Sequence, residues 1–264
     1  MPEPKKIRVT TFKEKSRRGE KIAILTAYDA TMARILDRAG CDALLVGDSL
    51  GMVIMGQEST LSVTMDMMVH HTRAVVRGTQ HALVIADMPF LSYQVNAEEA
   101  LRNAGRLMQE GCAEAVKLEG GNSPETIRRL VDAGIPVMGH VGLLPQSVHQ
   151  QGGYVMQGRS EADADKLFAE AAAIAQAGAF AIVLESLPES LAARITRDID
   201  IPTIGIGAGA GCSGQVLVSY DAFGLFDGFV PSFVKQYAHL GDAMSSAARA
   251  YIEDVRAGRF PAAS

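Results

Sequence analysis

The sequence contains no tryptophan, only three cysteines, and no long apolar or basic run. Cys41, Cys112 and Cys212 are odd in number and far apart, which predicts reduced cysteines rather than a disulfide framework. No stretch of about 18 uninterrupted apolar residues is present, and residues 1–6 lack an apolar signal core. We therefore expect a cytoplasmic protein with no membrane partner.

Basic residues are outnumbered, because 25 Lys and Arg stand against 30 Asp and Glu and give a formal net charge of −5. This balance argues against a nucleic-acid or anionic-membrane surface. A hydrophobic share of 48% is ordinary for a folded protein and too high for a disordered chain. With 264 residues and no visible linker, a single domain over residues 1–264 is expected.

Short, branched apolar runs recur along the chain and predict buried parallel strands, with helices between them that end in glycine. The strands are predicted over 22–27, 43–47, 82–86, 113–118, 135–139, 180–184 and 203–207, with an eighth in either 215–220 or 228–230. The helices are predicted over 31–39, 66–78, 97–110, 124–133, 161–177, 188–198 and 242–255. This alternation predicts a single-domain (β/α)₈ TIM barrel, with a doubly wound sheet as the alternative.

Five of these runs lead into a side chain that could carry chemistry: Asp48, Asp87, Glu119, His140 and Glu185. Parallel strands all point the same way, so we expect these groups to meet in one cleft at the C-terminal ends of the strands. A cluster of carboxylates there predicts a metal-dependent site. Taken alone, Asp48 or Asp87 could equally cap the following helix, but their coincidence with Glu119 favours a metal.

Lys117 and His140 each leave more than one interpretation open. Lys117 lies two positions before Glu119 in a predicted strand, so both side chains point to the same face. Lys117 could hold a negatively charged substrate there, or form a buried ion pair with Glu119. His140 could donate a hydrogen bond that orients a group of the site, act as a proton shuttle, or be a satisfied core histidine.

Two connections, residues 49–65 and 141–160, are too long for simple loops and leave the predicted C-terminal face, where binding loops and lids lie. A glycine cluster over residues 209–214 formally fits the GxGxxG nucleotide pattern, but a strand rather than a helix is predicted after it. We therefore expect these glycines to permit close backbone approach instead.

An ordered series of short segments carries a resemblance to a known family. The segments are GDSLGM (47–52), STLSVT (59–64), ADMPF (86–90), VKLEGG (116–121), GHVGL (139–143), GGY (152–154), VLE (183–185) and GIGAG (205–209). Together they resemble the ketopantoate hydroxymethyltransferase (3-methyl-2-oxobutanoate hydroxymethyltransferase) family nearly end to end. The order and spacing of the series make it far more specific than any one motif.

The resemblance implies a (β/α)₈ barrel that transfers a hydroxymethyl group from 5,10-methylenetetrahydrofolate to 3-methyl-2-oxobutanoate, using Mg²⁺, on the route to pantothenate and coenzyme A. It also implies a homo-oligomer, a decamer in this family. The implied roles are as follows: Asp48, Asp87 and Glu119 at the metal; Asp48, Ser49, Asp87 and Lys117 at the keto acid; Glu185 as the proton acceptor.

Three other functions remain open from the sequence. The nearest is a Mg²⁺-dependent C–C or C–P lyase of the phosphoenolpyruvate mutase and isocitrate lyase kind. Those enzymes rely on a reactive cysteine loop or on phosphate ligands, and neither is evident here. A Schiff-base aldolase through Lys117 is a further option. A non-catalytic barrel is disfavoured, because the whole acidic set is present.

Overall fold

The computed structural model describes residues 5–120 and 124–261. The chain divides into two compact units, Met1–Val216 and Leu217–Ser264. The first unit contains nearly all of the strands and most of the helices, and the second contains the last two helices. The prediction of one domain over residues 1–264 therefore stays a prediction.

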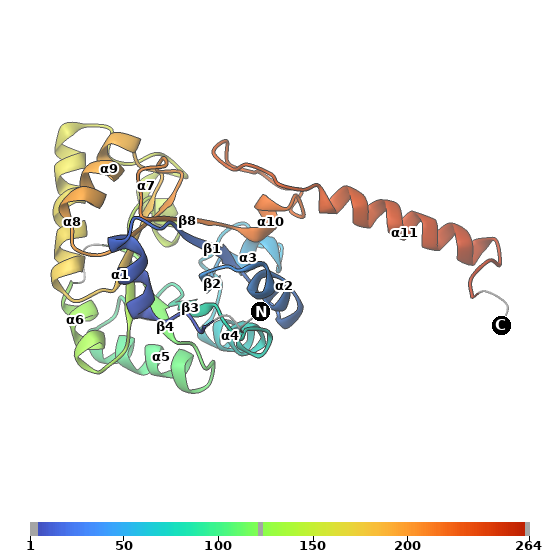
Figure 1. Cartoon of the computed structure of the whole chain (residues 1–264), viewed down its shortest axis with the longest axis horizontal. Coiled ribbons are helices and arrows are strands. Elements are labelled where there is room, and N and C mark those ends of the chain that lie inside the picture. The colour runs from blue at the N-terminus through green and yellow to red at the C-terminus, as the bar shows by residue number, and fades with distance from the viewer. Residues whose placement is uncertain (1–4, 121–123, 262–264) are drawn as a thin grey trace. The chain divides into compact units, whose positions relative to one another are not determined.

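Eight parallel strands close into a barrel in sequence order, from β1 to β8 (Figure 1). The strands are β1 (Ile22–Thr26), β2 (Ala43–Val46), β3 (Leu83–Asp87), β4 (Ala115–Lys117), β5 (Val137–Gly142), β6 (Ala181–Glu185), β7 (Thr203–Ile206) and β8 (Gly214–Leu217). This arrangement confirms the predicted (β/α)₈ barrel. The eighth strand overlaps the first of the two predicted positions, and it starts directly after the glycine cluster.

Helices alternate with the strands, and within the first unit they lie outside the barrel (Figure 1). They are α1 (Val9–Arg17), α2 (Ala30–Ala39), α3 (Leu50–Val53), α4 (Met65–Gly78), α5 (Ala97–Gln109), α6 (Pro124–Asp132), the 3₁₀ turn η1 (Pro145–Ser147), α7 (Val148–Gln151), α8 (Glu161–Gln176) and α9 (Glu189–Asp198). The second unit contains α10 (Ser219–Ala222) and α11 (Leu240–Arg256).

Helix α2 shows why these elements begin and end where they do. Asp29 accepts hydrogen bonds from the backbone N–H groups of Thr31 and Met32, at 2.8 and 2.9 Å, and so caps the helix. Gly40 ends it in the left-handed conformation, with φ of 94°. The chain then turns directly into β2.

The first helix, which no pattern in the sequence predicts, closes the N-terminal end of the barrel. Phe12 of α1 is fully buried and packs edge-to-face on Phe180, just before β6. Lys15 pairs with Asp42, just before β2, at 2.6 Å. Because α1 covers the ends where strands begin, the groups that follow the strands face the opposite end.

The barrel interior is apolar around its middle. Side chains from most of the strands meet there in one packed apolar cluster. They include Ile24, Leu45, Ile85, Met138, Val183, Ile204 and Val216. Within the described residues, no helix is long and apolar enough to cross a membrane.

Candidate active site

Asp48 and Ser49 follow β2 and turn into the short helix α3. Asp48 is buried, and its backbone N–H donates to Asp87 Oδ2 at 3.2 Å. The Ser49 hydroxyl lies 2.8 Å from the hydroxyl of Tyr28. A Cβ at Gly47 would lie 2.7 Å from Ser49 Oγ, so glycine at this turn leaves room for the Ser49 hydroxyl.

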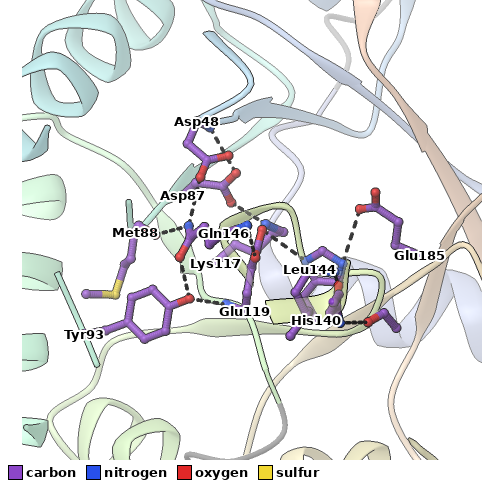
Figure 2. Close-up of polar contacts among 12 residues, drawn as sticks. Asp48, Asp87, Met88, Tyr93, Lys117, Glu119, His140, Leu144, Gln146 and Glu185 are labelled. Carbon is purple, nitrogen blue, oxygen red and sulfur yellow. Dashed lines mark hydrogen bonds and ion pairs between the residues drawn. The ribbon is translucent and has the colours of Figure 1, made fainter. Parts of the chain in front are cut away.

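Asp87 and Lys117 form a buried ion pair at the ends of two neighbouring strands. They are partners in the parallel register of β3 and β4, and Lys117 Nζ donates to Asp87 Oδ1 at 2.8 Å (Figure 2). Both side chains are almost fully buried. The ion pair that the sequence left open for Lys117 thus exists, but its partner is Asp87 rather than Glu119.

Glu119 is held by the loop that follows β5. The backbone N–H of Gln146, in η1, donates to Glu119 Oε2 at 3.0 Å. The side-chain amide of Gln146 donates to Asp48 Oδ2 at 2.8 Å and to the carbonyl of Met88 at 2.9 Å. One loop residue therefore contacts two of the three carboxylates predicted to lie at the metal (Figure 2).

His140 lies between Glu119 and Glu185 (Figure 2). Its Nε2 is 3.3 Å from Glu185 Oε2 and its Nδ1 is 3.7 Å from Glu119 Oε1, although neither ring nitrogen has hydrogen-bond geometry. The predicted strand end at residue 139 is wrong, because β5 continues to Gly142 and His140 pairs with Val183 inside the sheet. Glycine at 139 does not end the strand; a Cβ there would clash with Ile174 of α8, so its role is close helix packing.

Glu185 is the last residue of β6, and its side chain is 16% exposed, against 3–5% for Glu119 and Asp87. It is thus the acidic group most open to solvent among these three. The strand-end location of Asp87 and Glu185 agrees with the prediction to within one residue. The structure brings all the predicted site residues together at the C-terminal ends of β2 to β6.

Burial controls the protonation of this cluster. Desolvation and the neighbouring Asp87 raise the pKa of Asp48 to about 7, against the opposing pull of Lys117 and Gln146. Desolvation also raises the pKa of Glu119, while Lys117 opposes it. Burial acts to lower the pKa of Lys117, but Asp87, Glu119 and Asp48 outweigh it and raise that pKa. Burial lowers the pKa of His140, which favours its neutral form.

The donor set is suited to a hard divalent cation, since Asp48 and Asp87 present buried carboxylate oxygens side by side, next to the buried ammonium of Lys117. Across residues 5–120 and 124–261, however, no group of three His, Cys, Asp or Glu side chains is arranged to hold a metal ion. The assignment of Asp48, Asp87 and Glu119 to a metal stays a prediction.

Sequence reasoning missed Tyr93 and Gln146, which are both buried in the site. The long connection over residues 141–160 was predicted to lie over the C-terminal face, and Gln146 is part of it. No periodicity or charge pattern singles out either residue, because both lie in irregular segments after strands.

A parallel (β/α)₈ barrel with a buried acidic cluster and a lysine at the C-terminal ends of its strands defines an enzyme of the barrel class. The match to a family model is more specific. Residues 6–263 match the model described as ketopantoate hydroxymethyltransferase, and the chain belongs to that family. The resemblance read from the sequence is thereby confirmed.

Curated relatives agree with the family model. The chain is 55% identical over 258 residues to the 3-methyl-2-oxobutanoate hydroxymethyltransferase of Syntrophus aciditrophicus, covering 97% of this chain and 95% of that protein. It is 58% identical over 245 residues to the protein of the same name from Moorella thermoacetica, covering 92% and 91%.

Solved structures share the fold at low sequence identity. A putative phosphonomutase from Burkholderia cenocepacia superposes with a TM-score of 0.66 at 18% identity, covering 93% of this chain and 98% of that one. A 2,3-dimethylmalate lyase, described as a member of the phosphoenolpyruvate mutase/isocitrate lyase superfamily, gives 0.62 at 17% identity, covering 97% and 87%. At such identities the likeness establishes the barrel fold alone.

Proposed function

We propose that this protein transfers a hydroxymethyl group from 5,10-methylenetetrahydrofolate to 3-methyl-2-oxobutanoate, giving 2-dehydropantoate, the first step toward pantothenate. The observation that carries the proposal is family membership over residues 6–263, together with relatives that are more than half identical and named for this reaction. Tetrahydrofolate is the other product, and the oxygen of the new hydroxyl group comes from water.

We assign Asp48 and Asp87 as ligands of a divalent cation, Mg²⁺ in this proposal, with Glu119 beside them. Hard ions of this kind prefer carboxylate oxygens and leave positions open for substrate. When bound, such an ion supplies Lewis-acid stabilisation of the negative charge that develops on the keto acid. The buried surplus of carboxylates over cations supports the assignment.

Lys117 and Ser49 are assigned to the keto acid. Lys117 Nζ already holds Asp87 at 2.8 Å, so its charge lies next to the carboxylates that would bind the cation. A fixed ammonium there favours an anionic substrate and the charge that builds up during reaction. The Ser49 hydroxyl is oriented by Tyr28 and lies beside Asp48 in the same turn.

Glu185 is assigned as the general base that removes the C3 proton of the keto acid. The resulting carbon nucleophile forms a bond to the methylene carbon of the folate as one bond from that carbon to a folate nitrogen breaks. The bond to the second folate nitrogen then breaks as water adds the hydroxyl group, which releases tetrahydrofolate. Glu185 is more exposed than the buried carboxylates, and its Oε2 lies 3.3 Å from His140 Nε2. Because burial favours the neutral imidazole of His140, this neighbour adds no positive charge beside Glu185.

The direct test is turnover of 3-methyl-2-oxobutanoate with 5,10-methylenetetrahydrofolate and Mg²⁺, with 2-dehydropantoate followed by mass spectrometry. We expect product only when all three components are present, and loss of activity when a chelator is added. Folate-independent cleavage of isocitrate-like or phosphono acids would instead indicate the lyase alternative. Trapping of substrate on Lys117 by borohydride would indicate a Schiff-base aldolase.

We also propose that the protein acts in the cytoplasm as a homo-oligomer, a decamer as the family resemblance implies. Helix α11 of the second unit supports assembly, since none of its residues is buried. Met244 and Tyr251 on this helix are 63% and 57% exposed, an unusual state for large apolar side chains. Light scattering after size-exclusion chromatography would give the subunit number.

A further inference from the structure

Gln146 is a buried amide that lies in the centre of the carboxylate cluster although it comes from a loop. Only 4% of the residue is exposed, and it is separated by 98 positions in the sequence from Asp48, whose Oδ2 its side chain contacts at 2.8 Å. Its neighbours in η1 begin the connection from β5 to α8. Its contacts therefore tie this loop to the ends of β2, β3 and β4.

The orientation of the Gln146 amide is fixed by its partners. Its Oε1 accepts from the Tyr93 hydroxyl at 2.7 Å and from Gln94 Nε2 at 3.2 Å. The Tyr93 hydroxyl is available as a donor because its own oxygen accepts from the backbone N–H of Glu119 at 3.1 Å. With the oxygen so occupied, the two amide hydrogens must point to Asp48 and to the carbonyl of Met88.

The hydrogen bonds thus form a chain across the site in which each group donates to the next. The Glu119 backbone N–H donates to Tyr93, Tyr93 donates to Gln146, and Gln146 donates to Asp48 (Figure 2). Gln146 also contacts a second carboxylate, because its backbone N–H donates to Glu119 Oε2 at 3.0 Å. Asp87, the remaining carboxylate of the three, is held by Lys117. Each carboxylate therefore has a charged or amide donor that sets its direction.

We infer that Gln146, locked by Tyr93, is a positioning residue that aims Asp48 and Glu119 at the cation and keto-acid site and couples docking of residues 143–153 to formation of that site. This inference rests on the proposed function. Groups that orient ligating side chains from outside set metal affinity almost as strongly as the ligands themselves. A buried carboxylate that loses its donor is also free to turn away.

The test compares two methionine substitutions in the same loop. Gln146→Met keeps the length of the side chain but removes its donors and acceptor. Gln151→Met is the matched control, because the Gln151 amide bonds to backbone groups away from the carboxylates, Leu144 N–H in its own loop and Gly142 C=O at the end of β5, at 2.9 and 3.1 Å. Circular dichroism and thermal melting establish that each variant is folded.

Affinity for Mg²⁺ and for Mn²⁺ is measured by calorimetry without substrate. Gln146→Met is expected to weaken it by about 10- to 100-fold, the range typical for outer-shell partners, while Gln151→Met stays within about twofold. Hydrogen exchange gives a second readout. Mg²⁺ should slow exchange over residues 143–153 in the wild type and in Gln151→Met but not in Gln146→Met. Equal metal affinity and equal protection in the wild type and Gln146→Met would overturn the inference.

Tyr93→Phe removes one hydroxyl and keeps the ring, so it tests the hydrogen bond that orients the Gln146 amide and leaves the loop residues unchanged. We expect Tyr93→Phe to bind the cation more weakly than the wild type does. The double variant Tyr93→Phe/Gln146→Met should bind it no more weakly than Gln146→Met alone, since both changes break one network. Strictly additive losses would overturn the coupling between the two residues. A wild-type protein without hydroxymethyl transfer would instead overturn the proposed function, whatever the variants do.

Discussion

The two sides of the site differ in how firmly their side chains are held. On the side of β2 to β4, Asp48, Asp87 and Lys117 are buried and bonded to one another or to Gln146. On the side of β5 and β6, Glu185 is partly exposed and lies 3.3 Å from His140 Nε2 without hydrogen-bond geometry. The first arrangement suits fixed binding of charge, and the second suits a group that must move a proton.

The largest effect is expected from Glu185→Gln, which leaves the firmly held side intact. Loss of the general base should lower kcat by about 10²- to 10⁴-fold while binding of the keto acid is retained. Exchange of the C3 proton with deuterated solvent, followed by NMR, measures the step directly. Glu189→Gln, an exposed neighbour at the start of α9, is the matched control. Unchanged exchange in Glu185→Gln would show that another group is the base.

The second effect concerns stability. Asp87→Asn leaves the Lys117 ammonium buried without its carboxylate partner, which should lower the free energy of unfolding by about 3 kcal/mol. This is the lower end of the usual range, because Asp48 and Glu119 still attract the ammonium. Urea unfolding gives the value. Asp66→Asn breaks a surface pair with Arg106 and should cost far less; equal losses would contradict the contrast between buried and exposed pairs.

The third effect is on pH dependence, measured on metal-free protein in the presence of a chelator. The pKa of Asp48 is raised to about 7, while in the unfolded chain it is about 4. Between these values the folded protein holds a proton that the unfolded chain has lost, so stability should fall as pH rises from about 4 to about 7. Asp48→Asn should reduce the pH dependence of stability to the part that Glu119 contributes. An identical slope in the variant would contradict the assignment.

The smallest effect is expected from Tyr28→Phe, which removes the hydroxyl beside Ser49. One hydrogen bond contributes about 0.5–1.5 kcal/mol, so KM for the keto acid should rise between about twofold and tenfold with kcat nearly constant. Steady-state kinetics checks this. A fall in kcat with KM unchanged would show that Ser49 acts in the chemical step rather than in substrate binding.

Local sequence signals predicted most of the barrel. Seven strands were predicted to within one to three residues at either end, because short branched runs and glycine caps act over a few neighbouring positions. The short helix α1 escaped prediction. Its role depends on the distant Asp42 and Phe180, which no local pattern reveals.

The sequence by itself determined which chemical groups follow the strands, and parallel topology was enough to bring Asp48, Asp87, Glu119, His140 and Glu185 to one end of the barrel. Only the tertiary structure decided that Lys117 pairs with Asp87, since that contact follows from the register between β3 and β4. It also decided that Gln146 and Tyr93 enter the site. The physical reason is distance along the chain: side chains 53 and 98 positions apart meet only after irregular loops have packed, and periodicity carries no information about loops.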